Sequence, residues 1–451
     1  MISRQKKPGN LFQSYLPHLL NHKNPLYCLA NQIDWREFDD AFAPMYSADT
    51  GRPAKQIRLM VGLHYLKYAF DLSDEEVVLR WAENPYWQYF CGEDYFQTEF
   101  PIAPSLMTKW RQRLQSHNLE KLLEVTIKTG LKTKTLKKSD VARVNIDTTV
   151  QEKNITYPTD AKLYYRMLVK LGTLAKSDGI KLKQSYVRVG KRTLVMQNRY
   201  RHARQTKRAN RKVRKLKTYL GRLQREIERK ASASLKKSPQ YIDLMDKTMR
   251  LFEQKRDSKN KLYSIHAPEV ECISKGKVHK KYEFGCKVGV VSSSKNCFIL
   301  GAMAFHGNPH DSKTLGECLE QAESLLPNDI IIEQAFVDQG YRGHKYEGGI
   351  TINIVRRGWR KVKTSLRRWL SRRSAVEPVI GHMKNDCRLG RNYLHGIEGD
   401  NINAILSACG FNIRKLLADI FCLFFDFHSK IEFQQKMNLI LHNNCKYAMS
   451  A

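Results

Sequence analysis

The feature that most constrains the fold is a change of hydrophobic period near residue 140. Before that point apolar residues recur at helical spacing, as they do over residues 55–70. After it, Val144 and Ile146 alternate with polar residues, which predicts a strand that carries Asp147 on the face opposite the two aliphatic side chains. Strand character returns at Tyr282. The chain is therefore expected to combine a helical N-terminal part with a sheet whose strands come from distant segments.

The segment after Tyr282 predicts strands and helices in turn. Alternation from Tyr282 to Val290 and the apolar run 298–305 indicate a hairpin, and a helix is expected to begin near Asp311. A buried strand then ends at Asp338, another covers 350–354, and two helices follow. This order is typical of an α/β layer fold, a mixed sheet flanked by helices. We assign residues 140–430 to this domain and 431–451 to a C-terminal tail.

A basic helical segment, residues 161–262, is predicted to interrupt this domain as an insertion. Its apolar residues step by four and three positions, which is the spacing of a heptad seam: Ala209, Val213, Leu216, Leu220, Leu223 and Ile227. Three heptads predict a helical hairpin or a short coiled coil.

Short helices are predicted for the first 130 residues. Ser73 precedes Glu76 by three positions, which is the arrangement of a capping box. Another helix is expected to begin at Pro104-Ser105, with three cations on its polar side: Lys109, Arg111 and Arg113. Short helices joined by tight turns suit a DNA-reading module of helix-turn-helix type or a plain helical bundle. We favour the first and treat residues 1–130 as a DNA-binding region.

The charge of the chain calls for a polyanionic partner. Lysine and arginine number 78 against 44 acidic residues, a net charge of +34. The excess is concentrated in two stretches, residues 188–230 and 356–373. Nucleic acid is the expected partner, because neither stretch pairs its charge with the broad apolar face that an anionic membrane requires.

Cysteine spacing and hydrophobic runs point to a cytoplasmic protein. The ten cysteines include no Cys-x-x-Cys pair and no zinc spacing, so we expect reduced thiols and no zinc. The apolar stretch 416–427 is too short to span a membrane, and the N-terminus lacks the apolar core of a secretory signal.

Three acidic residues stand at the ends of predicted elements or on a strand: Asp147, Asp338 and Glu377. Any one of them alone is more often a cap or a partner of a helix dipole. Glu377 lies near a helix start because Pro378 is tolerated only in the first turn. Arg373, Gly381 and Lys384 share its helical face. Three carboxylates beside cations suit metal-assisted phosphodiester cleavage, in which two Mg²⁺ (or Mn²⁺) ions take oxygen ligands.

The sequence also resembles bacterial insertion-sequence transposases of the DDE class, in the family of insertion sequence five. The matching segments are Val144–Val150, Asn154-Ile155, Tyr157–Asp160, Gly307-Asn308-Pro309 with Asp311, Phe336–Gly343 and Arg372–Lys384. The family signature runs Tyr, two residues, Arg, three residues, Glu, six residues, Lys. Arg373, Glu377 and Lys384 satisfy it, while Leu370 fills the tyrosine position with Trp369 beside it.

This resemblance implies an RNase-H-like catalytic domain that holds divalent ions with Asp147, Asp338 and Glu377. It implies binding of terminal inverted repeats, followed by strand cleavage and transfer into target DNA. We expect Arg373 and Lys384 to contact the scissile strand, and the insertion to contact phosphates through Arg204, Lys207, Arg208 and Arg211. A homodimer or higher oligomer on nucleoid DNA is expected, with no membrane partner.

Two alternatives from other classes remain. The first is a catalytically inactive, transposase-derived DNA-binding protein or repressor, which the charge and the helical N-terminus fit equally well. The second is a structural RNA-binding protein with a basic coiled coil. Neither explains three acids at the predicted positions in so basic a chain.

Overall fold

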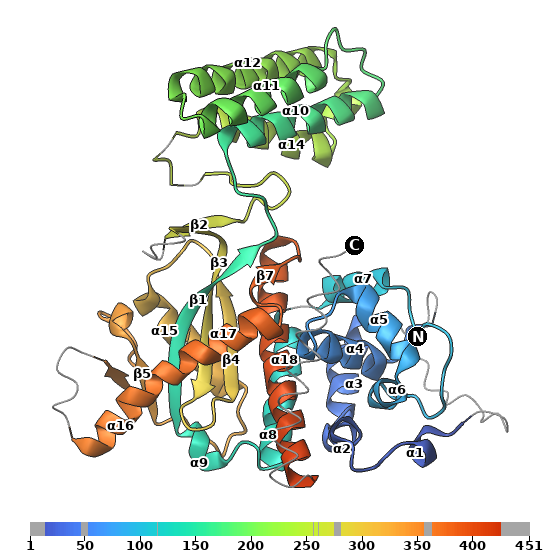
Figure 1. The fold of residues 1–451 in the computed structure, drawn as a ribbon, viewed down its shortest axis with the longest axis vertical. Helices are drawn as coiled ribbons and strands as arrows, with labels where there is room; N and C mark the ends of the chain where they lie inside the picture. The colour runs from blue at the N-terminus through green and yellow to red at the C-terminus, as the bar shows by residue number, and fades with distance from the viewer. Residues whose placement is uncertain are drawn as a thin grey trace.

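The structure is a computed structural model that describes residues 14–46, 53–114, 116–255, 257–259, 261–274, 281–355 and 363–424. A mixed sheet lies at its centre, N-terminal helices lie on one side and a helical bundle stands beyond one end of the sheet (Figure 1). The strands are β1 (Arg143–Lys153), β2 (Glu271–Ser274), β3 (Tyr282–Ser293), β4 (Ile299–Phe305), β5 (Gln334–Val337), β6 (Thr351–Ile354) and β7 (Arg391–Asn392).

The sheet runs in the order β2-β3-β1-β5-β6, with β4 also paired to β3 and β7 to β1. β3 is antiparallel to β1, β2 and β4, whereas β5 is parallel to β1 and to β6. The predicted mixed α/β sheet is thus confirmed. The expectation that β1 has only one buried face is wrong, because the polar side of the strand is covered as well: Asn145 on that side is fully buried.

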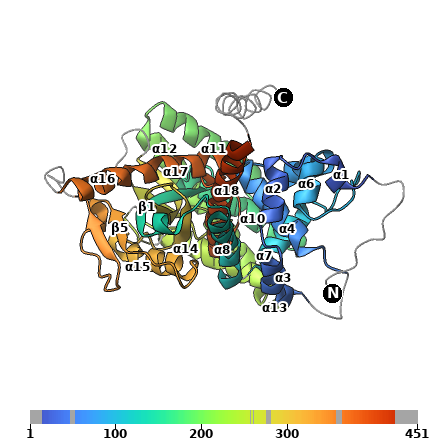
Figure 2. The same cartoon turned by 90° about the horizontal axis from the view of Figure 1, so that it is seen from below.

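Helices cover both faces of this sheet. α15 packs on one face, and α17 and α18 pack on the other (Figure 2). The helices that follow the hairpin are α15 (Asp311–Ser324), α16 (Thr364–Arg372), α17 (Val376–Asp386) and α18 (Gly396–Phe424), with 3₁₀ turns at Gln339–Tyr341 and Arg373–Ala375.

The N-terminal part is helical, as its patterns predict. Its elements are α1 (Leu16–Leu19), α2 (Pro25–Gln32), α3 (Arg36–Phe42), a 3₁₀ turn at Ala43–Met45, α4 (Ile57–Ala69), α5 (Asp74–Glu83), α6 (Pro85–Phe90), α7 (Ser105–Arg113), α8 (Ser116–Lys132) and α9 (Lys138–Val141). Ser73 and Glu76 form the predicted capping box at the start of α5.

The predicted position of Arg111 on the polar side of α7 is wrong. Arg111 is buried and forms a two-pronged ion pair with Asp74, with N–O distances of 2.6 and 2.9 Å. Lys67 joins the same carboxylate at 2.7 Å. The sequence pattern of α7 does not distinguish a buried Arg111 from a solvent-exposed one, because its partner Asp74 lies 37 residues earlier in the chain.

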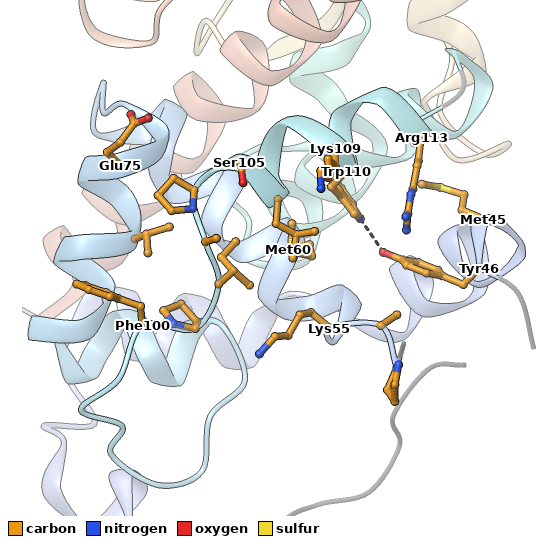
Figure 3. A pocket seen from close by; sticks show the side chains of 18 of the residues that line it. Met45, Tyr46, Lys55, Met60, Glu75, Phe100, Ser105, Lys109, Trp110 and Arg113 are labelled. Atoms are coloured by element: carbon orange, nitrogen blue, oxygen red, sulfur yellow. Dashed lines mark hydrogen bonds between the residues drawn. The ribbon is translucent and has the colours of Figure 1, made fainter. Parts of the chain in front are cut away.

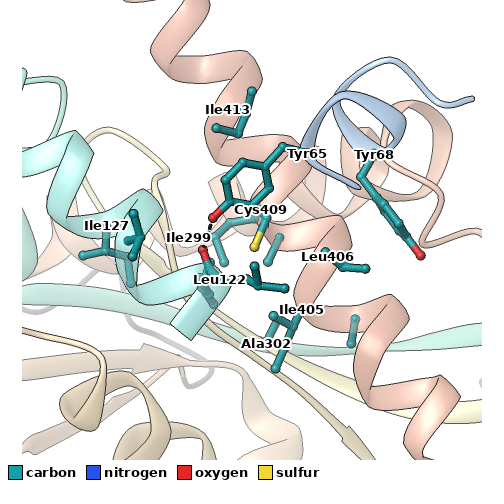
Figure 4. Packing of buried hydrophobic residues seen from close by; sticks show 14 of the residues in the cluster. Tyr65, Tyr68, Leu122, Ile127, Ile299, Ala302, Ile405, Leu406, Cys409 and Ile413 are labelled. Carbon is teal, nitrogen blue, oxygen red and sulfur yellow. Dashed lines mark hydrogen bonds between the residues drawn. The ribbon is translucent and has the colours of Figure 1, made fainter. Parts of the chain in front are cut away.

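One hydrophobic core joins the N-terminal helices to the sheet, and α18 lies between them (Figures 1 and 2). Figure 4 shows α18 residues such as Leu406 and Cys409 packed among Tyr65 of α4, Leu122 of α8 and Ile299 of β4. The Tyr65 hydroxyl donates to the Leu122 carbonyl at 2.6 Å. A Cβ atom added at Gly410 would lie 2.7 Å from the backbone carbonyl of Tyr68, so α18 approaches α4 at a distance that only glycine permits.

The segment between β1 and β2 forms a bundle with a hydrophobic core of its own (Figure 1). Its helices are α10 (Asp160–Ser177), α11 (Val187–His202), α12 (Thr206–Lys230), α13 (Ala233–Lys236) and α14 (Pro239–Glu253). The predicted seam on α12 is buried, but its partners are α10 and α11 rather than one opposing helix. The expected hairpin or coiled coil is therefore replaced by a multi-helix bundle.

No helix within the described residues is both long enough and apolar enough to cross a membrane.

Candidate active site

Strand pairing brings Asp147 and Asp338 to the same level of the sheet. The parallel register of β1 and β5 pairs Asn145 with Phe336, and each aspartate follows two residues later. Asp338 comes directly after β5 and caps the next 3₁₀ turn, where its carboxylate accepts from the Gly340 amide at 2.8 Å. Asp147, in the middle of β1, and Asp338, directly after β5, therefore lie beside each other.

The turn before α17 carries Glu377 and is anchored to β1. The Asn145 side chain donates to the Arg372 carbonyl at 3.1 Å and accepts from the Ser294 hydroxyl at 2.6 Å. This buried link holds Arg373 over the strand that bears Asp147. Glu377 then stands in the first turn of α17.

The Arg373 guanidinium contacts all three predicted acidic residues. Its Nη2 atom lies 2.8 Å from Asp147 Oδ2 and 3.6 Å from Asp338 Oδ2, and Nη1 lies 3.3 Å from Glu377 Oε1. We call these four residues the acid cluster. The side chains of Asp147, Asp338 and Glu377 are 18%, 39% and 65% exposed, so the cluster opens progressively from the sheet toward solvent.

The donor set of the acid cluster fits a hard divalent ion. All three carboxylates supply oxygen, which Mg²⁺ and Mn²⁺ prefer. Three negative charges this close repel one another, and Arg373 supplies the compensating charge between them. Its Nε atom is buried and has no hydrogen-bond partner within the described part of the chain, so the guanidinium is not fully satisfied where it lies.

A fourth carboxylate, Asp311, adjoins the acid cluster. The sequence indicates it as a helix start and as part of a segment that matches the transposase family, but not as a site residue. Its Oδ1 atom accepts from the Thr148 hydroxyl at 2.7 Å and pairs with Lys287 at 2.9 Å. A Cβ atom at Gly340 would lie 3.0 Å from both Asp311 Oδ2 and Asp338 Oδ1. Glycine at this position therefore allows the two carboxylates to approach.

Tyr341 lies behind the same carboxylates. Burial raises the pKa of its hydroxyl well above the ordinary value, and the nearby negative charges of Asp147, Asp311 and Asp338 raise that pKa further. The hydroxyl therefore stays protonated, and the Tyr341 side chain beside the carboxylates is uncharged.

Leu370, Trp369 and Lys384 flank the acid cluster along α16 and α17. Leu370, at the position of the family tyrosine, is 6% exposed, and the Trp369 ring stacks on Phe336 and lies under Arg143. Lys384 is partly buried in the last turn of α17, two helical turns beyond Glu377.

The four basic residues predicted in the insertion are exposed and lie away from the acid cluster. Arg204 precedes α12, and Lys207, Arg208 and Arg211 lie in its first two turns. Figure 1 shows α12 on the side of the bundle that faces away from the sheet.

A cavity of about 970 Å³ lies in the N-terminal helices and contains none of the predicted site residues (Figure 3). The Trp110 indole donates to the Tyr46 hydroxyl at 2.9 Å on its wall. Its lining carries three cations and one carboxylate: Lys55, Lys109, Arg113 and Glu75.

Comparison with known proteins identifies two transposase segments, one in the N-terminal helices and one that runs from α14 of the bundle into α18. Residues 14–113 match a transposase domain (DUF772), and residues 239–413 match a transposase DDE domain, which includes Asp338 and Glu377. The chain is also 51% identical over 197 residues to an uncharacterized protein, ORF8 of the nfe locus of Rhizobium meliloti; the match covers 44% of this chain and 95% of that protein. No solved structure matches. The chain is therefore similar to transposases in two segments, and the second of these, the DDE domain, holds Asp338 and Glu377.

Proposed function

We propose that the protein is a transposase that binds the terminal inverted repeats of an insertion sequence of the insertion-sequence-five type, and cleaves and transfers DNA strands there with divalent metal ions. The observation that carries the proposal is the convergence of Asp147, Asp338 and Glu377 on one guanidinium. The proposal assumes that the sheet is RNase-H-like, with Asp147 on β1, Asp338 directly after β5 and Glu377 on α17. The chain is expected to act on DNA in the bacterial cytoplasm as a homodimer or higher oligomer.

Asp147, Asp338 and Glu377 would hold two Mg²⁺ or Mn²⁺ ions. Such ions activate the attacking oxygen and stabilise the leaving one. Arg373 now occupies the space between the carboxylates, so its guanidinium must swing away before they ligate ions. Since Glu377 is largely exposed and Arg373 lies in the preceding turn, that movement would carry the guanidinium toward the DNA phosphates, with which arginine pairs in two-pronged fashion.

A cleavage assay tests the catalytic assignment. Purified protein is incubated with DNA that carries the element's ends and Mg²⁺ or Mn²⁺, and nicks at the termini are mapped. Asp338→Asn should reduce the cleavage rate by about 10³-fold or more, since a lost ion ligand forfeits several kcal/mol of transition-state stabilisation. Binding should persist or tighten, because a negative charge near phosphate is removed.

The matched control is Glu317→Gln, an exposed acid on α15. Its cleavage rate should equal that of the wild type. Unimpaired cleavage by Asp338→Asn would refute the assignment, and specific binding without cleavage in either metal would favour the inactive DNA-binding protein or repressor.

The bundle is proposed to hold DNA through phosphates rather than bases. Neutralising Arg204, Lys207, Arg208 and Arg211 together should flatten the dependence of log affinity on log salt by about 0.9 for each lost phosphate contact. The control neutralises four exposed lysines elsewhere on the bundle: Lys170, Lys176, Lys236 and Lys237. An equal change in both variants would argue against a specific phosphate-binding face on α12.

Lys384 is proposed to position the scissile strand. Lys384→Ala should lower the cleavage rate at saturating DNA more than it lowers affinity, because many other cations still bind the duplex. A variant that binds more weakly but cleaves normally when saturated would make Lys384 a binding residue only.

A further inference from the structure

A second polar cluster lies at the end of the sheet that faces the bundle, away from the candidate active site. Cys286 of β3, His306 directly after β4 and Asp400 in the first turns of α18 place their sulfur, nitrogen and oxygen atoms within 4.8 Å of one another. Cys286 is 1% exposed and Asp400 is 2% exposed. We call Lys153, Glu269, Glu271 and Asp400, together with Cys286 and His306, the neck cluster.

The His306 ring is oriented by acidic residues on both sides. Its Nδ1 atom lies 3.9 Å from Glu271 Oε1, and its Nε2 atom lies 3.7 Å from Asp400 Oδ2. The Nε2 atom is buried and has no hydrogen-bond partner among the described residues, and the same is true of Glu271 Oε2. A buried ring nitrogen without a partner is costly unless a ligand completes it.

The charges of the neck cluster do not balance without a further cation. Lys153 pairs with Glu269 and with Asp400 Oδ1, each at 2.9 Å, and Glu271 adds a third carboxylate. The side chains of Lys153, Glu269 and Asp400 are 4%, 8% and 3% exposed, so water screens them poorly. The three carboxylates and one ammonium leave a net charge of −2, which becomes −3 with a Cys286 thiolate, so a divalent ion would reduce the net charge to −1.

The two oxygen atoms of the Asp400 carboxylate have different neighbours. Asn392 Nδ2 donates to Oδ1 at 2.7 Å, and Lys153 pairs with the same atom. Oδ2 remains directed at His306. Near it, the Cys286 sulfur accepts only a long hydrogen bond of 3.6 Å from Gln151.

From this geometry we propose that Cys286, His306 and Asp400 bind one zinc ion, with water in the fourth position. Thiolate, imidazole and carboxylate are the ligand types that zinc combines in tetrahedral sites. Ligand atoms around tetrahedral zinc lie roughly 3.5 Å apart, so the three side chains close by about 1 Å on binding. Glu271 then holds His306 through Nδ1, in the carboxylate–histidine arrangement that orients zinc ligands.

Binding releases one proton. When the zinc–sulfur bond forms, the Cys286 S–H bond breaks and its proton leaves to solvent. Zinc uptake should accordingly weaken as the pH falls.

The position of the neck cluster suggests a structural role. Lys153 is the last residue of β1, where the chain leaves for the bundle, and Glu271 is the first residue of β2, where the chain returns. Asp400 belongs to α18, which packs on the sheet. Zinc at this point would link the two segments that connect the sheet to the bundle, the end of β1 and the start of β2, to α18 (Figure 1).

The test uses the full-length chain after removal of any affinity tag. Zinc content is measured by elemental analysis of protein from zinc-supplemented culture, and the stripped protein is titrated with Co²⁺. The wild type should carry close to one tightly held zinc ion and give a thiolate-to-cobalt charge-transfer absorption. The acid cluster offers only oxygen ligands, so it cannot produce that absorption.

The variants separate a metal site from a simple ion network. Cys286→Ser should lose the cobalt absorption and the zinc, whereas Cys318→Ser, an equally buried thiol on α15, should keep both. Should Cys286→Ser not fold, His306→Gln changes a side chain at the edge of the cluster that is 21% exposed, and it should also release the zinc. Glu271→Gln should weaken zinc binding about 10- to 100-fold. The proposal would be overturned if the wild type carried no zinc and added zinc did not change its thermal stability. It would also be overturned if the Cys286→Ser variant kept the cobalt absorption.

Discussion

The acid cluster and the neck cluster lie along the same strand and are built from the same charges, yet they differ in access to solvent. Arg373 contacts three carboxylates in the first, and Lys153 contacts two in the second, where Glu271 lies beside His306 instead. Glu377 is 65% exposed, whereas Asp400 in the neck cluster is 3% exposed. An open cluster can exchange its internal cation for ions and phosphates during a reaction cycle. A closed one can only retain its cation, which suits a structural role.

The largest expected difference follows removal of the central cation from the neck cluster. Lys153→Met leaves Glu269 and Asp400 buried without their ammonium partner and should lower the free energy of unfolding by about 3–5 kcal/mol. Urea unfolding measures this loss. The control is Lys138→Met, because Lys138 pairs with Asp329 at the surface, where such pairs contribute about 0–1 kcal/mol. If Lys153→Met and Lys138→Met lowered the free energy of unfolding equally, burial would not make the Lys153 ion pairs more stabilising than the surface pair of Lys138.

A smaller and reversible loss is expected from the acid cluster. Arg373→Gln in metal-free protein should lower the free energy of unfolding by about 1–3 kcal/mol, since Asp147 loses a charged hydrogen bond at 2.8 Å. Added Mg²⁺ should restore the stability of Arg373→Gln, but not that of Lys153→Met. The exposed Arg342→Gln serves as control. A failure of Mg²⁺ to rescue Arg373→Gln would show that the guanidinium does not occupy the place of a metal ion.

The smallest expected effect is a pH dependence of the neck cluster. Burial pushes the pKa of Glu269 up, but hydrogen bonds from Lys153 and backbone amides outweigh it, and the net pKa is lowered. Because the folded pKa lies below the unfolded value, this stabilisation is complete above about pH 4.3 and is lost as the pH falls through the folded pKa.

Chemical unfolding at a series of pH values checks this prediction. Below about pH 4.3 the wild type should lose stability more steeply than Glu269→Gln, by less than about 1.4 kcal/mol per pH unit. The exposed Glu347→Gln should keep the wild-type slope. Identical slopes for the wild type and Glu269→Gln would place the Glu269 carboxylate outside the ion network.

Local patterns in the sequence predicted the elements of the sheet well. The alternation around Val144 and Ile146 marked β1, and Pro378 placed Glu377 in the first turn of α17, because these signals depend only on near neighbours in the chain. The position of Asp338 after a buried strand was equally readable. What the sequence could not show was the parallel register that aligns the two aspartates, or the Asn145 link that holds Arg373 above them.

Contacts between distant segments account for the remaining differences. The expectation that zinc is absent, drawn from cysteine spacing, stays untested; the site proposed at Cys286, His306 and Asp400 would leave no local motif, because the three residues belong to separate elements. Likewise the seam of α12 was visible, while its packing against α10 and α11 depends on how three helices share one core. The roles of the acid cluster and of the exposed bundle cations stay predictions.

The close packing of α18 against both the N-terminal helices and the sheet affects where DNA would be cut relative to the bases that the protein reads. At Gly410 the helix meets the Tyr68 backbone too closely to slide or tilt independently, and farther along it packs against β4 of the sheet. Suppose that the N-terminal helices read a terminal repeat. The distance between the bases that they contact and the bond that is cut is then fixed, because α18 holds the N-terminal helices and the sheet rigidly together. Inserting base pairs into that interval should shift the cut by the same number rather than be absorbed by the protein.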